Sequence, residues 1–233
     1  MIRTYYEDHT WEEIRDMDKS KMVVVQPIAS VEDHGYHLRL DTDNIITKAV
    51  CKEAVENCQG TALLLPHLPY GVEAHHMDFP GTISIDYQHL IDYVTDVTKS
   101  LAHHGFMKIL IVNGHGSNHN PMEIASRLTN LATEAECFSC SYWSLTVDTV
   151  KEIRDSPSPG GIAHAGEFET SLYLHLKEEG VDMSKAVNEI YPGFSKYFYV
   201  DLIGGSGPAT TLSWWSSYTE SGVMGDATVS TKE

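Results

Sequence analysis

The sequence predicts an α/β protein in which helices pack against a central, mostly parallel β-sheet. Two observations support this fold class. Short apolar runs of strand length alternate with helical segments, an arrangement typical of parallel βαβ crossovers. One of these runs is apolar almost throughout, as in strands that are covered on both faces. With 233 residues and neither a repeat nor a dividing linker, the chain is predicted to form a single domain, 1–233.

The candidate strands are four apolar runs. The third, Met-Lys-Ile-Leu-Ile-Val-Asn, is rich in β-branched residues and is the almost continuous one. The fourth contains Cys137 and Cys140, whose side chains would point to opposite faces of a strand. This CxxC pair is therefore not expected to share a metal or to act as a redox pair. The predicted strands cover residues 22–28, 61–65, 107–113 and 136–143.

Five segments have the sequence patterns of helices. In the third, apolar residues recur at spacings of one, three and four, so that one stripe faces the core. Asp41 or Thr42 could cap the second helix, and Pro121 suits the first turn of the fourth. The predicted helices cover residues 10–18, 42–57, 87–104, 121–134 and 167–179.

The charge balance argues against nucleic acid and anionic membranes as partners. Lysine and arginine number 16 against 33 acidic residues, which gives a net charge of −17 with neutral histidines. No apolar run approaches the roughly 20 residues of a membrane helix, and the N-terminus lacks the apolar stretch of a signal peptide. We therefore expect a cytoplasmic protein, in which the four cysteines are free thiols.

The first candidate site follows the first predicted strand, within the segment 30–43. In an extended chain Glu32 and His34 project to the same side, and Gly35 lets the chain turn. Asp43 can return from the first turn of the next helix, and its two oxygens can bridge two cations. The alternative is a polar surface loop with solvated acids.

A second candidate site follows the third predicted strand. His115 stands between two glycines in Asn-Gly-His-Gly-Ser-Asn, which leaves its imidazole unshielded. In open α/β sheets, ligands bind beyond the carboxyl ends of the strands, where both of these segments are expected. The alternative is a tight turn in which an asparagine caps the following helix.

A third motif, His-Ala-Gly-Glu-Phe-Glu, starts at His164 and leads into the last predicted helix. Glu167 and Glu169 would lie about 200° apart around that helix, so only one of them can face a site. The other is structural or solvated, because acids in a first helical turn also complement the helix dipole. His164 is placed to act as a general acid or base.

Together these segments supply carboxylates and imidazoles without a thiolate, a donor set that suits Zn²⁺, Mn²⁺ or Fe²⁺. Five ligands exceed the three that a single catalytic zinc usually takes from protein. With a bridging carboxylate they fit two cations about 3.5–4 Å apart that share a hydroxide, which would be the nucleophile. The predicted ligands are Glu32, His34, Asp43, His115 and Glu167.

The order of these motifs, together with Phe-Pro-Gly-Thr at 79–82, resembles the creatininase (creatinine amidohydrolase) family over most of the chain. The resemblance implies a three-layer α/β/α sandwich, a homohexamer, and two divalent metal ions in an amidohydrolase that acts on small cyclic amides. Carried onto matching positions, it gives one ion to Glu32, Asp43 and His115. It gives the other to His34, Asp43 and Glu167, with His164 as the proton-transferring residue.

Departures from the family pattern bear on the substrate. Ser117 stands where creatininase has an acid for the second metal, which is why that role goes to Glu167. Where creatininase has a tryptophan over the substrate, the segment shortly before His164 has Pro157, Pro159 and Gly160 and no tryptophan. Trp214 and Trp215 could cover the pocket from another side or pack in the core. Creatinine itself is therefore a poor candidate. The residues expected to contact substrate are His37, Arg39, His76 and Ser117.

The sequence thus predicts a metal-dependent hydrolase that opens the C–N bond of a small ring. One alternative is cleavage of a carbon–carbon bond in a cyclic diketone such as 3-dehydro-scyllo-inosose, as in another member of the family. An alternative of a different class is a metal-binding protein without catalytic turnover.

Overall fold

A four-stranded, entirely parallel sheet forms the centre of the α/β part of the computed structural model, which describes residues 3–232. Its strand order is β2-β1-β3-β4, and each strand lies within one of the predicted apolar runs. The predicted parallel sheet is confirmed. The strands are β1 (Val23–Ile28), β2 (Ala62–Leu64), β3 (Lys108–Asn113) and β4 (Glu136–Ser141).

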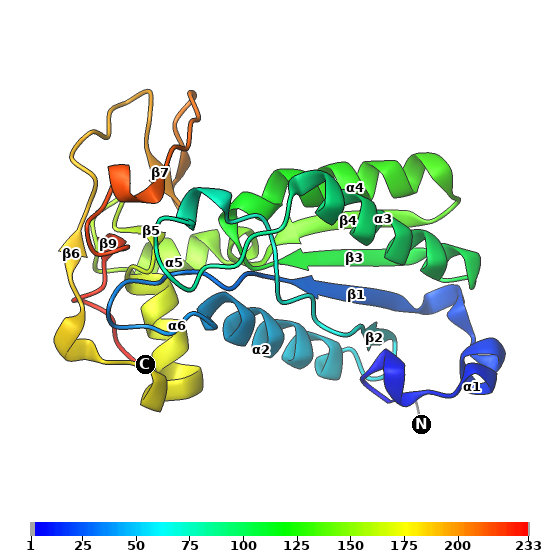
Figure 1. Ribbon diagram of the computed structural model, residues 1–233. Helices are drawn as coiled ribbons and strands as arrows, with labels where there is room; N and C mark the ends of the chain where they lie inside the picture. Colours follow the sequence, from blue (N-terminus) through cyan, green and yellow to red (C-terminus); the bar gives the residue numbers. More distant parts are fainter. Residues whose placement is uncertain (1–2, 233) are drawn as a thin grey trace. The chain divides into compact units, whose positions relative to one another are not determined.

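Helices cover both faces of this sheet, as Figure 1 shows: α3 (Tyr87–His103) and α4 (His119–Ala132) pack on one face and α2 (Thr42–Asn57) on the other. In α3 the predicted stripe is buried, and the Asp86 side chain caps the helix by accepting the Gln88 N–H. The core between these layers contains Val24, Leu63 and Ile111, all fully buried. The α/β fold expected from the sequence is confirmed.

The described residues divide into two units. The first contains the parallel sheet and comprises residues 3–30, 47–72 and 85–142. The second comprises residues 31–46, 73–84 and 143–232 and therefore includes the first turn of α2. In residues 3–232 no helix is long and apolar enough to cross a bilayer, and the four cysteines are free.

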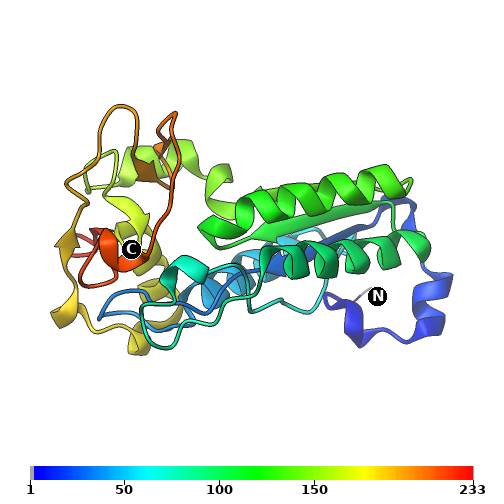
Figure 2. The same ribbon diagram turned by 45° about the horizontal axis from the view of Figure 1, so that its top comes forward.

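Short elements that the sequence analysis did not predict build most of the second unit. They include an antiparallel sheet of order β5-β9-β6 and a β7–β8 hairpin. Figure 2 shows that the yellow-to-red part of the chain, which carries most of them, consists largely of loops. Strands of two or three residues show no periodicity from which they could be predicted. These elements are α5 (Val147–Ile153), β5 (Ile162–His164), β6 (Asn188–Glu189), β7 (Val200–Asp201), β8 (Gly205–Ser206) and β9 (Met224–Asp226). The last predicted helix is present in the same unit as α6 (Glu167–Lys177).

The remaining helical elements are short. The helix α1 (Trp11–Asp16) begins with a capping box, in which Thr10 and Glu13 each accept a backbone N–H of the other. The 3₁₀ helices are η1 (Tyr6–Asp8), η2 (Lys19–Lys21), η3 (Ala74–His76), η4 (Gly116–Asn118), η5 (Tyr142–Leu145), η6 (Glu178–Gly180), η7 (Met183–Lys185) and η8 (Trp215–Ser217).

A buried ion pair connects α5 to the β7–β8 hairpin in the second unit. The Arg154 guanidinium donates to both carboxylate oxygens of Asp201, each at 3.1 Å, and both side chains are almost fully buried. Asp201 also accepts backbone N–H groups of Gly160, Ile203 and Gly204. One carboxylate therefore fixes the loop after α5 and the hairpin turn together.

Replacing Asp201 with alanine is expected to lower the free energy of unfolding by about 3–5 kcal/mol, because the Arg154 guanidinium then stays buried without its counter-charge. Urea denaturation followed by circular dichroism measures this loss. Asp182→Ala is the matched control, since it removes an exposed ion pair to Lys185 in the same unit. An equal drop in the denaturation midpoint of both variants would contradict the expectation.

Candidate metal centre

Residues 31–46 place three of the predicted ligands in the interior of the second unit. Glu32, His34 and Asp43 are each no more than 2% exposed. Gly35 makes the necessary turn with φ at +66°, and a Cβ there would lie 2.5 Å from Val223 Cγ2. The segment is therefore a buried, tightly packed loop, and not the solvated surface loop that was the alternative interpretation.

His34 and Asp43 form a direct buried pair. The two ends of the His34 ring are fixed: Nε2 lies 3.1 Å from Asp43 Oδ1, and Nδ1 lies 3.3 Å from the Glu32 carbonyl oxygen. Burial lowers the pKa of His34, but the charge and hydrogen bond of Asp43 and the charges of Glu169 and Glu32 together outweigh it and raise this pKa to about 10. The pair thus behaves as a site where a carboxylate holds a positive charge.

Glu169, and not the predicted Glu167, faces this cluster. Ligand atoms of His34, His164 and Glu169 all lie within 4.8 Å of one another. Ala165, with φ at +50°, turns the chain into α6, and its N–H donates to Glu169 Oε2 at 2.5 Å. Burial raises the pKa of Glu169, and so does the negative charge of Asp43. Such a carboxylate gains most from a bound cation.

Glu167 has a structural role at the same helix end. Its two carboxylate oxygens accept the backbone N–H groups of Asp155 and Ser156, at 2.8 and 2.9 Å. These bonds anchor the loop after α5 to the first turn of α6. The assignment of Glu167 to the cluster from sequence is corrected here, because the side chain is turned toward that loop.

Asp33, which the sequence analysis did not select, holds two histidines in place. Its Oδ1 accepts from His76 Nδ1 at 2.7 Å, and its main-chain oxygen accepts from His164 Nε2 at 2.8 Å. Burial raises the pKa of Asp33, but the hydrogen bonds from His164 and His76 outweigh it and lower this pKa well below its usual range. Asp33 is therefore ionised and orients both imidazoles.

Trp215 covers the two imidazoles. Its ring stacks on His76 with centroids 4.4 Å apart and planes at 28°, and it meets His164 edge-on at 5.2 Å. The indole N–H donates to the Gly222 carbonyl oxygen at 3.0 Å. Trp215 is buried in a hydrophobic cluster with Ala163 and Met224, so the interpretation that it packs in the core is confirmed, and from there it also contacts both imidazoles. Trp214 is exposed.

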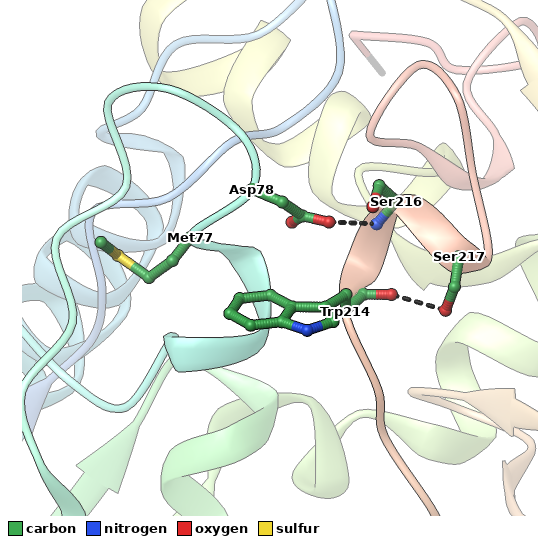
Figure 3. A pocket seen from close by; sticks show the side chains of 5 residues that line it. All are labelled: Met77, Asp78, Trp214, Ser216 and Ser217. Carbon is green, nitrogen blue, oxygen red and sulfur yellow. Dashed lines mark hydrogen bonds between the residues drawn. The ribbon is translucent and has the colours of Figure 1, made fainter.

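A surface hollow of about 520 Å³ is formed by residues that neighbour His76 and Trp215 in the sequence (Figure 3). It is lined by Met77, Asp78, Trp214, Ser216 and Ser217. Asp78 Oδ2 accepts the Ser216 N–H at 2.9 Å, which joins the two walls of the hollow. Met77 follows His76 and Trp214 precedes Trp215, so each wall continues directly into a residue that packs around the site.

The other predicted substrate contacts in the second unit have defined positions. His37 is buried, and its Nε2 lies 2.9 Å from Thr170 Oγ1 on α6. Burial, together with the nearby His34 and His164, lowers the pKa of His37 to about 4. Arg39 is exposed, and the neighbouring Asp41 pairs with Lys177, not with Arg39.

His115 and Ser117 belong to the first unit, beyond the carboxyl end of β3. His115 is buried, and the Asn113 side chain bonds both its N–H and its carbonyl oxygen. Gly114 is needed here, because a Cβ would lie 1.6 Å from Thr47 Oγ1 on α2. Ser117 is half-buried in η4. The ligand role of His115 and the substrate role of Ser117 stay predictions.

Comparisons with known proteins agree with this chemistry. A family model described as "Creatininase: Creatinine amidohydrolase" matches residues 7–233. The chain is 30% identical to a creatinine amidohydrolase of Pseudomonas putida over 92% of this chain and 88% of that protein. A solved structure described as creatininase in a Mn form superposes with a TM-score of 0.81 at 26% identity, covering 98% of this chain and 90% of the other.

Relatives with other described activities also match. A mycofactocin precursor peptide peptidase of Mycolicibacterium smegmatis is 32% identical over 72% of this chain and 63% of its own length. A 3-dehydro-scyllo-inosose hydrolase of Thermotoga maritima is 26% identical over 98% of this chain and 76% of its own length. The shared fold therefore accompanies hydrolases with different described substrates.

The two acids of α6 can be separated by experiment. Glu169→Gln is expected to weaken the binding of a divalent metal, because the cluster loses a buried carboxylate. Glu167→Gln, two residues away in the same helical turn, is the matched control and should keep its metal while its loop becomes more susceptible to proteolysis. Metal content after gel filtration measures the difference, and the reverse order of metal loss would return the ligand role to Glu167.

Proposed function

The chain belongs to the creatininase family, and we propose that it is a dinuclear metal-dependent hydrolase that opens a small cyclic substrate at a C–N bond. That it is a metal-dependent hydrolase follows from the family. One observation carries the finer proposal: a buried group of carboxylates and imidazoles, with an oriented histidine beside it, at the motifs that the resemblance singles out.

The donor set fits divalent cations of the zinc and manganese type. His34 and Glu169 offer one imidazole and one carboxylate within 4.8 Å of each other, and Asp43 lies 3.1 Å from His34. We infer that these three hold one ion and that Glu32 helps hold the other, with the predicted His115. When bound, such ions activate water and polarise a substrate carbonyl.

His164 is the proton carrier in this proposal. Its Nε2 is fixed by the main-chain oxygen of Asp33, and Trp215 packs against its ring. Burial and the nearby His34 lower the pKa of His164, but Asp33, Glu32 and Glu169 outweigh them and raise it. The imidazole is thus held in one orientation and can hand a proton to the leaving nitrogen of the opened ring.

The substrate is proposed to be small and to enter near the hollow lined by Met77, Asp78 and Trp214. A second candidate is hydrolysis of a carbon–carbon bond in a cyclic diketone of the inosose type. It is favoured by the segment 156–161, which is rich in proline and glycine and contains no tryptophan, and by the similarity to the Thermotoga hydrolase.

The proposal includes a homohexamer in the cytoplasm. Self-association is supported by an exposed apolar stripe on α4, formed by Ile124, Leu128 and Leu131 at positions i, i+4 and i+7. Of these, Leu131 is 85% exposed. Sedimentation velocity of the purified chain tests this part of the proposal.

A substrate panel tests the reaction itself. Lactams, cyclic ureides, inososes and a linear peptide are incubated with metal-loaded enzyme, and ring opening is detected by the mass of one added water. We expect turnover of at least one cyclic compound and about two metal ions per chain. Bound metal with no product across the panel would instead support the non-catalytic metal-binding alternative.

His164→Gln is expected to reduce the rate of that reaction by about 10²–10⁴-fold, the usual contribution of a general acid or base. His175→Gln, in the last turn of α6, is the control and should retain the wild-type rate. Steady-state kinetics on the cyclic substrate found in the panel measure both variants. A wild-type rate in His164→Gln would remove the proposed proton transfer.

A further inference from the structure

Three residues of the second unit converge in a combination that the sequence analysis did not predict. Ligand atoms of Glu32, His76 and His164 all lie within 4.8 Å of one another, and all three side chains are buried. The two imidazoles face the two oxygens of one carboxylate. His76 Nε2 lies 3.7 Å from Glu32 Oε2, and His164 Nδ1 lies 3.7 Å from Glu32 Oε1.

The 3.7 Å separations suit metal ligands better than hydrogen bonds. A nitrogen–oxygen hydrogen bond in proteins measures about 2.7–3.2 Å. Two ligands at about 2.0–2.1 Å from a tetrahedral zinc ion lie about 3.3 Å apart. Each nitrogen is thus a few tenths of an ångström beyond the spacing that it would have to its nearest Glu32 oxygen across a bound ion, and the three donors lie within 4.8 Å of one another.

Asp33 has already oriented both histidines as metal ligands are usually oriented. A ligating histidine generally donates its other ring N–H to a carboxylate or a backbone carbonyl, which fixes the tautomer. Asp33 supplies one of each: its carboxylate accepts from His76 Nδ1 and its main-chain oxygen accepts from His164 Nε2. Both remaining ring nitrogens are thereby directed at Glu32.

Trp215 fixes the same two rings from outside. It stacks on His76 and contacts His164 edge-on, so neither imidazole can rotate without displacing a buried indole. The rings are also close to each other, with centroids 4.8 Å apart. This arrangement is built around the three donors and is not an incidental meeting of surface residues.

We propose that Glu32, His76 and His164 form a further divalent-metal position, with the two-histidine, one-carboxylate donor set that zinc occupies in several hydrolases. It differs from the two positions of the proposed function, at His34, Asp43 and Glu169 and at Glu32 with His115, in depending on His76, and it adds a third equivalent when metal is in excess. Its consequence for turnover rests on the proposed function: an ion bound here occupies His164 Nδ1 and withdraws that imidazole from proton transfer. Zinc in excess is then an inhibitor.

Cobalt(II) is the probe for counting this position. Metal-free protein is titrated with Co²⁺, and the bound equivalents are counted by calorimetry and by the visible absorbance of the bound ion. Wild-type protein is expected to bind one equivalent more than His76→Gln. His75→Gln is the matched control, because His75 packs against the same Trp215 but is not among the three donors. It should bind as many equivalents as wild type.

Asp33→Asn provides a second test that keeps His76 in the chain. Loss of an outer partner of a ligating histidine typically costs about 10–100-fold in metal affinity. We expect a weakening of this size for the additional equivalent only. Circular dichroism of each variant confirms that the comparison is made between folded proteins.

Equal numbers of Co²⁺ equivalents in wild type and His76→Gln, with unchanged affinity in Asp33→Asn, would overturn the site. This outcome is separable from failure of the proposed function. A protein that binds the additional ion but opens no ring keeps the site and loses the proposed reaction. An active hydrolase whose metal count is independent of His76 keeps the reaction and loses the site.

Discussion

The structure of the second unit depends on burying several carboxylates and imidazoles in one interior. A buried ionised group costs several kcal/mol unless it is paired, so each acid here needs a positive partner. Asp43 pairs with His34, whose pKa is raised, and the Asp33 carboxylate accepts the Nδ1–H of His76. For Glu169, burial and the charge of Asp43 oppose ionisation. Divalent cations neutralise such a set more completely than protons do.

Asp33 and Trp215 hold the histidines of this interior in fixed orientations. A metal-assisted hydrolase needs its histidines in fixed tautomers, and a hydrogen bond at one ring nitrogen determines what the other can do. Asp33 fixes two rings at once, and Trp215 prevents their rotation by packing against both. Because Asp33 lies between Glu32 and His34 in the chain, one short loop supplies both potential ligands and the group that orients their neighbours.

Much of the parallel sheet could be predicted from sequence, because long regular elements have readable periods. The stripe of α3 and the β-branched run of β3 are such cases. The second unit could not be predicted in this way, since β5 and β9 are only three residues long and pair through long-range contacts. Helical geometry predicted that only one acid of α6 can face the site. It could not predict that this acid is Glu169, because the choice depends on the turn at Ala165 and on the loop that Glu167 anchors.

In the proposed function, substrate choice depends on the exposed residues around the hollow more than on the buried carboxylates and imidazoles. The motifs predicted to supply metal ligands lie in tightly packed segments, where Gly35 has no room for a side chain. The hollow beside them has an exposed indole at Trp214 and a carboxylate at Asp78 that ties Ser216 to the opposite wall. Exposed loop residues of this kind can change without disturbing a buried cluster. A family with one metal-binding interior can therefore include hydrolases whose substrates differ in both size and bond type.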